Sequence, residues 1–195
     1  MKNWEFVVSF WAKRRIYFKN YKYTHCRMKR ENIQMIWDQE NRFLLKKDWK
    51  NVLIIMWINP STADDKKPDA TMRKVMWFAE KNWYDWFAMI NIIPQRATFP
   101  CDINPNPNIA LMNKNHEVIN NLMNSIKNPH ILLAFWNTIE EKKYFIKRFK
   151  NIVSIIKPYT PKFLKIWLTK NWNPLHPSRA WYCKLTEFHV DEYLK

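Results

Sequence analysis

The chain has 195 residues, of which 47% are hydrophobic, and a formal net charge of +16 from 33 Lys and Arg against 17 Asp and Glu. This length is typical of a single domain with one sizeable core, and three scattered cysteines without a C-x-x-C pair argue against a disulfide framework, a zinc knuckle and a cysteine-ligated cluster. No apolar run reaches the roughly 18 residues that span a bilayer, and the charged start lacks the apolar centre of a signal peptide, so we expect a cytoplasmic monomer without a membrane partner.

Residues 1–48 are the first of three predicted parts of this single domain, residues 1–195. They contain the β-forming segments EFVVSF and RRIYFKNYKYTHCRM, followed by ENIQMIWDQENRFLL, whose pattern is ambiguous. We expect a β-rich N-terminal extension that adds a hairpin or edge strands to the main sheet.

Residues 49–180 are predicted to form an α/β core. Four short apolar runs lack alternation, as expected for strands covered on both faces: VLIIMWI (52–58), FAMINII (87–93), HILLAFW (130–136) and FLKIWL (163–168). Helical spacing separates them, in residues 72–79, 109–126 and 139–152. The alternation predicts three α/β/α layers around a mostly parallel sheet with right-handed crossovers, and residues 181–195 are expected to be a C-terminal tail.

The segment KNWYDWF, residues 81–87, stands between a predicted helix and a predicted strand, where a turn normally lies. It contains two tryptophans and no glycine, and the whole chain has 12 Trp and no Gly. Average usage would give roughly 14 glycines in a chain of this length. A tryptophan forced to a positive φ costs about 1–2 kcal/mol, so this composition is physically unexpected.

Polar residues follow each predicted core strand, and ligands of open α/β sheets bind outside the carboxyl ends of the strands. The topology therefore brings together a candidate site made of Asn59, Asn91, Arg96, Asn137, Lys170 and His176. Each residue also has a local explanation. Asn59 is compatible with an Asx-type turn, Ser61 or Thr62 with a helix cap, and His176 with a surface loop.

Residues 58–100 contain an NPSTAD box and, further on, an Arg-Ala-Thr box. These boxes resemble those of the uncharacterised bacterial and phage family catalogued as domain of unknown function 1643. In that family an acidic residue and a Thr precede an Arg-bearing helix, and they match Asp69, Thr71 and Arg73. The resemblance continues to LTKNWNPLHPSR (168–179) and covers about residues 5–180.

The resemblance places glycine in the family at seven tryptophan positions of this chain, which are Trp57, Trp77, Trp83, Trp86, Trp136, Trp167 and Trp172. Our hypothesis is that most of these tryptophans are mis-decoded glycines, because some bacterial lineages read UGA as glycine whereas the common alternative table reads it as tryptophan. A genuinely tryptophan-rich protein and a glycine-free design are the alternatives. UGG codons at positions 83 and 86 would exclude the hypothesis.

A more distant resemblance concerns function. With glycine at position 57, the first box reads Gly-Ile-Asn-Pro-Ser and is similar to the first motif of the mismatch-type uracil-DNA glycosylases. LHPSR is similar to the His-Pro-Ser motif that closes their active site, and MINIIPQRATFP looks like their strand-end Asn segment. The resemblance implies a uracil-DNA-glycosylase-like fold and hydrolysis of the N-glycosidic bond of a base flipped out of DNA.

The resemblance also implies roles for individual residues. Asn59 would position a water, Asn91 would hydrogen-bond the base edge, and His176 would stabilise negative charge on the departing base, with Asp64 as candidate general base. Further substrate contacts would come from Pro60, Ser61, Thr62, Arg96, Asn137 and Ser178, and phosphate contacts from Arg73, Lys170 and Arg179. No metal and no other cofactor is expected.

Two other classes of function stay open. The charge of +16 favours a nucleic-acid partner through counterion release, although abundant Lys, Asn and Ile are also what AT-rich codons produce. A non-catalytic module that binds a nucleotide, a modified base or single-stranded DNA would use the same residues. A structural protein of phage or mobile elements would need none of them.

Overall fold

The computed structural model describes residues 34–46, 50–60 and 70–195. The first two β-forming segments of the predicted extension lie outside these ranges. Four residues singled out above also lie outside the described residues, namely Ser61, Thr62, Asp64 and Asp69.

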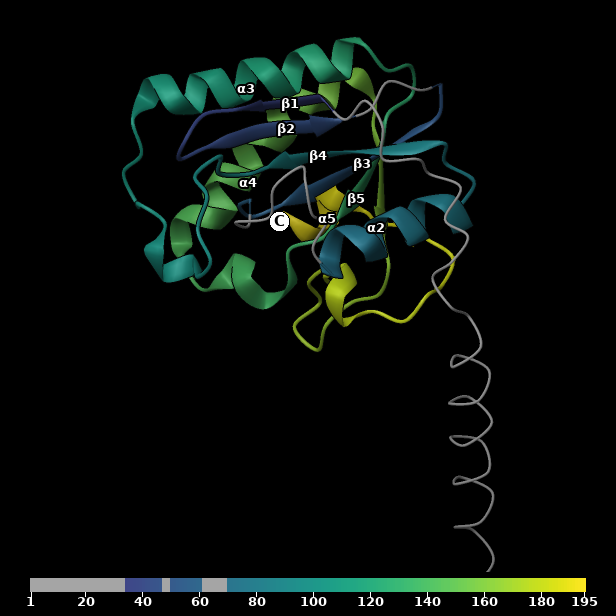
Figure 1. The fold of residues 1–195 in the computed structure, drawn as a ribbon. Coiled ribbons are helices and arrows are strands. Elements are labelled where there is room, and N and C mark those ends of the chain that lie inside the picture. The colour runs from purple at the N-terminus through teal and green to yellow at the C-terminus, as the bar shows by residue number, and fades with distance from the viewer. Residues whose placement is uncertain (1–33, 47–49, 61–69) are drawn as a thin grey trace, which may run out of the picture.

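A seven-stranded sheet with the order β1-β2-β4-β3-β5-β6-β7 forms the centre of the described chain (Figure 1). The strands are β1 (Gln34–Trp37), β2 (Arg42–Lys46), β3 (Val52–Trp57), β4 (Trp86–Asn91), β5 (His130–Leu133), β6 (Lys162–Lys165) and β7 (Thr186–Glu187). The four central strands are the four predicted apolar runs, and they pair in parallel in the order β4-β3-β5-β6.

The prediction of a mostly parallel sheet is wrong, because β1, β2 and β7 all pair antiparallel. Three of the six strand pairings in the described sheet are parallel and three are antiparallel. The error has a physical origin. β1 and β7 carry exposed residues, so they lack the continuous apolar run that marks a buried parallel strand, whereas β2 is buried and stands in the segment whose pattern is ambiguous.

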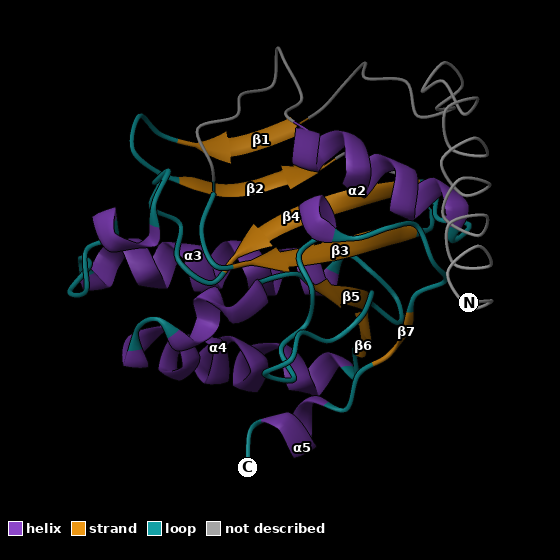
Figure 2. Ribbon diagram, turned by 90° about the horizontal axis from the view of Figure 1, so that it is seen from below, coloured by secondary structure: helices purple, strands orange, loops and turns teal. Residues whose placement is uncertain are grey.

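Helices cover both faces of the sheet (Figure 2). They are α2 (Ala70–Lys81), α3 (Ile109–Asn124), α4 (Lys143–Ile156) and the short α5 (Val190–Tyr193), with 3₁₀ turns η1 (Pro100–Asp102), η2 (Trp136–Glu140), η3 (Lys157–Tyr159) and η4 (Pro177–Arg179). The three predicted helices are confirmed, and so is the mixed α/β class. Among the described residues, no helix combines the length and apolar character needed to cross a membrane.

Two separate apolar clusters hold these layers together. Residues of α2 pack with one face of the sheet, and residues of α3 and α4 pack with the other. In α4 the apolar spacing places Phe145, Phe149 and Ile152 on one buried stripe. Each such side chain contributes roughly 1.5–3 kcal/mol when it is fully buried, so the clusters fix the position of each helix on the sheet.

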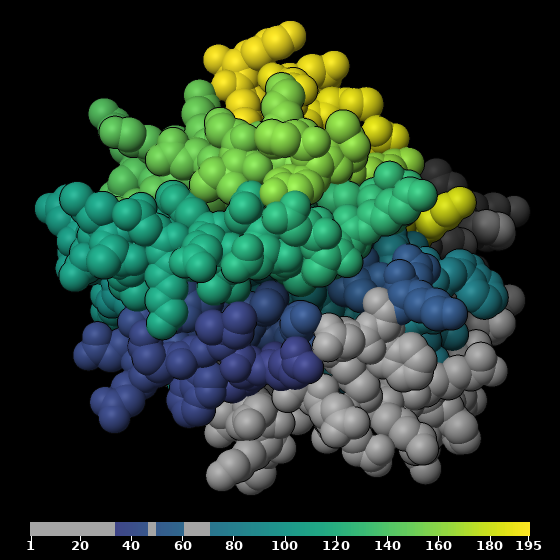
Figure 3. Space-filling view, turned by 90° about the horizontal axis from the view of Figure 1, so that it is seen from above, coloured from purple at the N-terminus to yellow at the C-terminus, as the bar shows by residue number. Residues whose placement is uncertain are grey.

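The last residues of the chain, within the predicted C-terminal part 181–195, contribute to the sheet and to the core. β7 pairs with β6, while Phe188 and Val190 join the apolar cluster under α4. Figure 3 shows the C-terminal residues lying against the α4 segment, and the β1–β2 hairpin lying beside α3. The segment is short and mixes apolar with charged residues without a clear period, so its sequence pattern gave little sign of this packing.

Three tryptophans have left-handed backbone conformations that normally favour glycine. The φ angles are 66° at Trp83, 57° at Trp136 and 64° at Trp172. Trp83 forms the turn after α2, whereas Trp86 is the first residue of β4 and is only 1% exposed. The turn in KNWYDWF therefore needs glycine-like freedom at one of its two tryptophans.

Tyr84 and His130 meet at the amino ends of the parallel strands. The Tyr84 hydroxyl lies 2.7 Å from His130 Nδ1. Burial raises the pKa of Tyr84 to about 12. Burial and the nearby charge of Lys162 lower the pKa of His130, and burial lowers the pKa of His116 in α3. Both imidazoles are therefore held in the neutral form.

Replacing Trp83 with Gly is expected to raise the free energy of unfolding by up to about 1 kcal/mol. The relief of about 1–2 kcal/mol of left-handed strain exceeds the roughly 0.5–1 kcal/mol lost to glycine's freedom in the unfolded chain. The indole of Trp83 is 87% exposed, so its removal loses little buried area. Urea unfolding measures the change. Trp167→Gly is the matched control, because Trp167 is 59% exposed and its φ is not left-handed. Equal changes in the two variants would contradict the strain mechanism.

Lowering the pH from 7 to 5 is expected to reduce the free energy of unfolding. A histidine whose folded-state pKa lies below its unfolded value of 6.5 binds its proton first in the unfolded chain. Stability is therefore present above pH 6.5 and is lost as the pH falls toward the folded-state pKa. His130→Gln removes this contribution, so the stability gap between the intact chain and the variant should narrow as the pH falls. A gap that widens over this range would refute the assignment.

Candidate functional site

The carboxyl end of β3 is the point where the described sheet changes the direction of its connections. The helix that follows β3, α2, lies on one face, whereas α3 and α4, which follow β4 and β5, lie on the other. Because β4, β3, β5 and β6 are parallel, their carboxyl ends share one edge. Open α/β sheets bind ligands at such a point.

Asn59, two residues beyond β3, links two of the sequence motifs. Its side-chain nitrogen Nδ2 donates to the Ala97 carbonyl at 2.8 Å and to the Pro60 carbonyl at 3.2 Å. The Ala97 amide donates to the same Pro60 carbonyl. Asn59 is half-buried, and within the described chain no hydrogen bond to its Oδ1 is present. The bonds to Nδ2 therefore fix the orientation of the Asn59 amide.

His176 reaches the same edge from the far end of the chain. Its ring lies against the indole of Trp57, the last residue of β3, with ring centroids 4.7 Å apart and planes tilted by 59°. The Ser178 backbone amide donates to His176 Nδ1 at 3.2 Å, and the Ser178 hydroxyl lies 2.7 Å from the same nitrogen. A backbone N–H only donates, so Nδ1 is unprotonated. Nδ1 therefore acts as the acceptor of this bond, and Nε2 is the ring nitrogen that can donate.

A buried hydrogen-bond network holds the loop that bears His176. Asn173 is 1% exposed and donates from Nδ2 to Glu140 at 2.7 Å and to Asn137 at 3.2 Å. The Tyr193 hydroxyl donates to Asn173 Oδ1, and the Thr169 hydroxyl donates to Asn137 Oδ1 at 2.6 Å. The network connects the loop after β6 with η2 and α5. It is the reason why the His176 segment has a defined position.

The network also sets two pKa values. Hydrogen bonds from Asn171 and Asn173 lower the pKa of Glu140, which keeps this carboxylate ionised and accepting. Burial and the nearby Glu140 carboxylate raise the pKa of Tyr193 to about 12, which keeps its hydroxyl protonated and donating. Both groups therefore hold the protonation state that the network requires over the neutral pH range.

Asn91 lies at the end of β4 and is fully buried. Its Nδ2 donates to the Arg42 carbonyl of β2 at 3.0 Å, and its own carbonyl accepts from Asn115 Nδ2 of α3 at 3.0 Å. The Oδ1 atoms of Asn91 and Asn115 are buried and have no hydrogen-bond partner among the described residues. A ligand that contacted the Asn91 side chain would have to do so through Oδ1. Its role in reading a base edge stays a prediction.

The remaining candidate residues surround this edge unevenly. The Arg96 guanidinium lies 6.0 Å from the Trp37 ring centroid in the β1–β2 hairpin, and Arg179 lies 5.8 Å from that of Trp136. Arg73 and Lys170 are exposed. The structure thus joins Asn59 to the Arg-Ala-Thr box and Trp57 to His176, whereas it directs Arg96 toward the hairpin.

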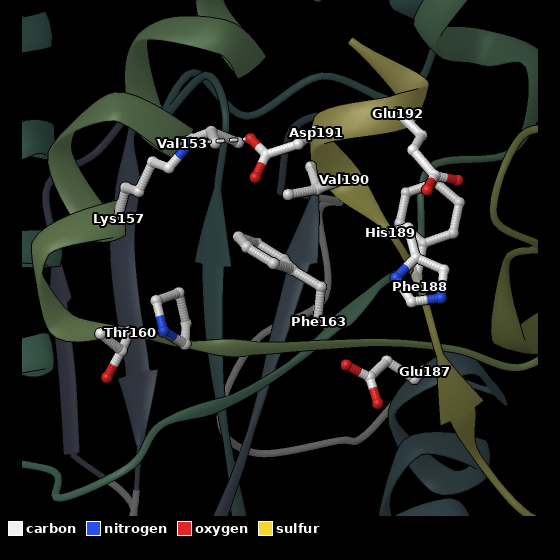
Figure 4. A pocket seen from close by; sticks show the side chains of 11 residues that line it. Val153, Lys157, Thr160, Phe163, Glu187, Phe188, His189, Val190, Asp191 and Glu192 are labelled. Atoms are coloured by element: carbon white, nitrogen blue, oxygen red, sulfur yellow. Dashed lines mark hydrogen bonds and ion pairs between the residues drawn. The ribbon is translucent and has the colours of Figure 1, made fainter.

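A separate hollow of about 460 Å³ lies elsewhere, between α4, β6 and the β7–α5 segment (Figure 4). Its lining contains none of the predicted site residues. Lys157 pairs with Asp191 at 2.8 Å and Lys162 pairs with Glu187 at 3.4 Å, so charged groups around it already have partners. The described residues also contain no group of three or more His, Cys, Asp or Glu side chains that could hold a metal ion.

Sequence reasoning missed the supporting residues of this edge. Asn173 stands within the quoted segment LTKNWNPLHPSR, but its burial and its bonds to Glu140 and Tyr193 depend on contacts that no local pattern encodes. Trp57 was considered only as a misread glycine, and its contact with His176 was not foreseen.

Comparisons with known proteins give one match. The model of a family described as "Protein of unknown function (DUF1643)" matches residues 42–178. No curated protein matches the chain, and no solved structure matches it.

Replacing Asn173 with Ala is expected to lower the free energy of unfolding by about 1–3 kcal/mol, because the side chains of Asn137, Glu140 and Tyr193 lose a buried partner together. Urea unfolding provides the measurement. Asn171→Ala is the matched control, since Asn171 is exposed and its side chain donates only to Glu140 among the bonds described. It should cost less than about 1 kcal/mol. A loss at Asn171 as large as that at Asn173 would contradict the proposed network.

Proposed function

We propose, from the premise that this chain belongs to the family of proteins of unknown function (DUF1643), that the edge around the carboxyl end of β3 binds a nucleobase of DNA and hydrolyses its N-glycosidic bond. The observation that carries this proposal is the contact between Trp57 and His176. It brings His176 against the last residue of β3, which precedes Asn59 by two positions, although the two segments are far apart in the sequence.

The fold supports the proposal by analogy. The central strands β4, β3, β5 and β6 are parallel, α2 packs on one face, and α3 and α4 pack on the other. This order is compatible with the three-layer arrangement of the uracil-DNA glycosylases. A shared architecture does not establish a shared activity, so the chemistry has to come from the residues at the edge.

Asn59 and His176 supply the two groups that the reaction needs. Asn59 Oδ1 accepts a hydrogen bond from a water and places its oxygen near the anomeric carbon. The water oxygen bonds to C1′, the bond from C1′ to the base nitrogen breaks, and the electron pair leaves with the base. His176 Nε2–H then hydrogen-bonds the negative charge that develops on the base, as a neutral imidazole does when it acts as an electrophile. The proton of the water passes to the medium or to a nearby carboxylate.

Binding of DNA is supported by the charge of the described surface. Arg73, Lys170 and Arg179 are exposed, and the chain has a formal net charge of +16. Lysine and arginine side chains hold phosphates and gain affinity through counterion release. An enzyme reaches the glycosidic bond of a base in a duplex only after that base has flipped out of the stack. Phosphate contacts then have to hold the DNA strand on both sides of the flipped nucleotide.

Non-catalytic binding of a nucleotide or a nucleic acid is the second candidate. It is favoured by one observation, since the fixed acceptor of Asn59 and the neutral imidazole of His176 suffice to bind a base without a general base. Asp64, the carboxylate assigned to that role from the sequence, lies outside the described residues.

The test uses DNA duplexes that carry uracil, hypoxanthine or a mismatch, followed by cleavage at abasic sites. The chain is expected to release a base, and Asn59→Ala and His176→Ala are each expected to reduce the rate by about 10²–10³-fold, as for loss of one transition-state hydrogen bond. Asn51→Ala is the matched control, because Asn51 immediately precedes β3 and lies at the opposite edge of the sheet. Its rate should stay within a few-fold of the intact chain.

The same duplexes separate the two candidates. Binding without release, with an affinity that falls steeply with salt and depends on His176, supports the non-catalytic module. If the chain shows no base release and no binding that depends on Asn59 or His176, a nucleobase site at this edge is refuted.

A further inference from the structure

We propose that the indole of Trp57 occupies the place of the ligand's base ring, so that it competes with a nucleobase for the site. The inference rests on the proposed function and names the group that controls access to it. A chain with a small residue at position 57 then has an open site, and the chain with Trp57 binds only when the indole moves away.

The position of Trp57 is the first observation. It is the last residue of β3, it pairs in register with Asn91 of β4, and it lies two residues before Asn59. Its side chain is 6% exposed and belongs to the apolar cluster on the α2 face of the sheet. The indole therefore fills the space at the carboxyl end of β3, where the helices after neighbouring strands lie on opposite faces and ligands of such sheets bind.

The second observation is the contact with His176. The imidazole and indole rings are 4.7 Å apart between centroids, so a ring in the place of the indole would contact His176 directly. An indole is a fused six- and five-membered aromatic system with an N–H in the smaller ring. A purine has the same ring system, and a pyrimidine fits within its outline.

The third observation is an unmet hydrogen bond. Trp57 Nε1 is buried and has no hydrogen-bond partner among the described residues. Buried indole N–H groups usually find a partner, and leaving one without an acceptor is unfavourable. The indole of Trp57 thus fills this space, but its Nε1–H has no acceptor among the described residues. A nucleobase carries several donors and acceptors on its ring edge and suits a site flanked by Asn59 Oδ1 and His176.

Trp86 shows what a purely structural tryptophan looks like in the same sheet. It is the first residue of β4, 1% exposed, and stacks on Phe87 with centroids 5.0 Å apart and planes inclined by 17°. It lies at the amino end of the parallel strands, opposite Val52 of β3 and away from His176. The two buried tryptophans therefore differ in their place in the sheet and in the contact of Trp57 with His176, and not in the burial of Nε1, so Trp86 provides a matched control.

The experiment compares Trp57→Gly and Trp86→Gly. Each removes one buried indole, and each is expected to lower Tm by on the order of 10 °C. Indole at millimolar concentration should restore several degrees in both, because both leave an indole-shaped cavity. Hypoxanthine or uracil as the free base should raise Tm only in Trp57→Gly. That effect should disappear in the double variant Trp57→Gly with His176→Ala, whereas rescue by indole persists.

Trp57→Ala provides a smaller cavity in case the glycine variant does not fold. The intact chain provides an independent readout, because competition by the indole reduces its affinity for a free base at least tenfold relative to a variant without it. An intact chain that binds a free base as tightly as Trp57→Gly, in a manner that depends on His176, would overturn the inference and leave the proposed function standing. Variants that take up indole but no nucleobase would overturn the proposed function.

Discussion

The parallel pairing of β4, β3, β5 and β6 is the constraint on which the rest of this molecule depends. β3 and β4 have every residue buried, and such strands are stable only when both faces are covered. Coverage of both faces requires helices on both sides, and the parallel direction requires crossovers that bring each strand's carboxyl end to one edge. The candidate site depends on this geometry, because the parallel direction places the carboxyl ends of β4, β3, β5 and β6 at one edge, where Trp57 contacts His176.

The common direction of the strands does not by itself fix the side chains at the carboxyl edge of the sheet. Two sets of hydrogen bonds hold Asn59 and the loop that bears His176 in place. The side-chain amide of Asn59 is held by the backbone carbonyls of Pro60 and Ala97, which fixes its orientation. Asn173 fixes the loop that carries His176 by joining it to η2 and α5. Polar groups positioned in this way before a ligand arrives need little reorganisation on binding, which is the condition for stabilising a developing charge.

The core of this fold was predictable from the sequence because the relevant signals are local. Four unbroken apolar runs and three helical stripes identify β3 to β6 and α2 to α4, since burial on two faces or on one stripe leaves a period in the sequence. The antiparallel strand β7 has only two residues, both exposed, and the burial of Phe188 and Val190 depends on α4 and β6. The Asn173 network likewise joins residues from three separate segments. Such features depend on tertiary contacts, so no periodicity reveals them.

The tryptophans illustrate how one residue type meets three different physical environments in one chain. At Trp83 and Trp172 the side chain is exposed and the backbone is left-handed, so the indole adds strain without burial. At Trp86 the indole is an apolar core group stacked on its neighbour. At Trp57 it fills the carboxyl end of β3 against His176, with its N–H lacking a partner among the described residues. A glycine would relieve strain in the first case, would open a cavity in the second, and in the third would open a cavity beside His176. Whether position 57 holds tryptophan or glycine therefore decides more than stability, because it sets whether the edge of the sheet is closed or accessible.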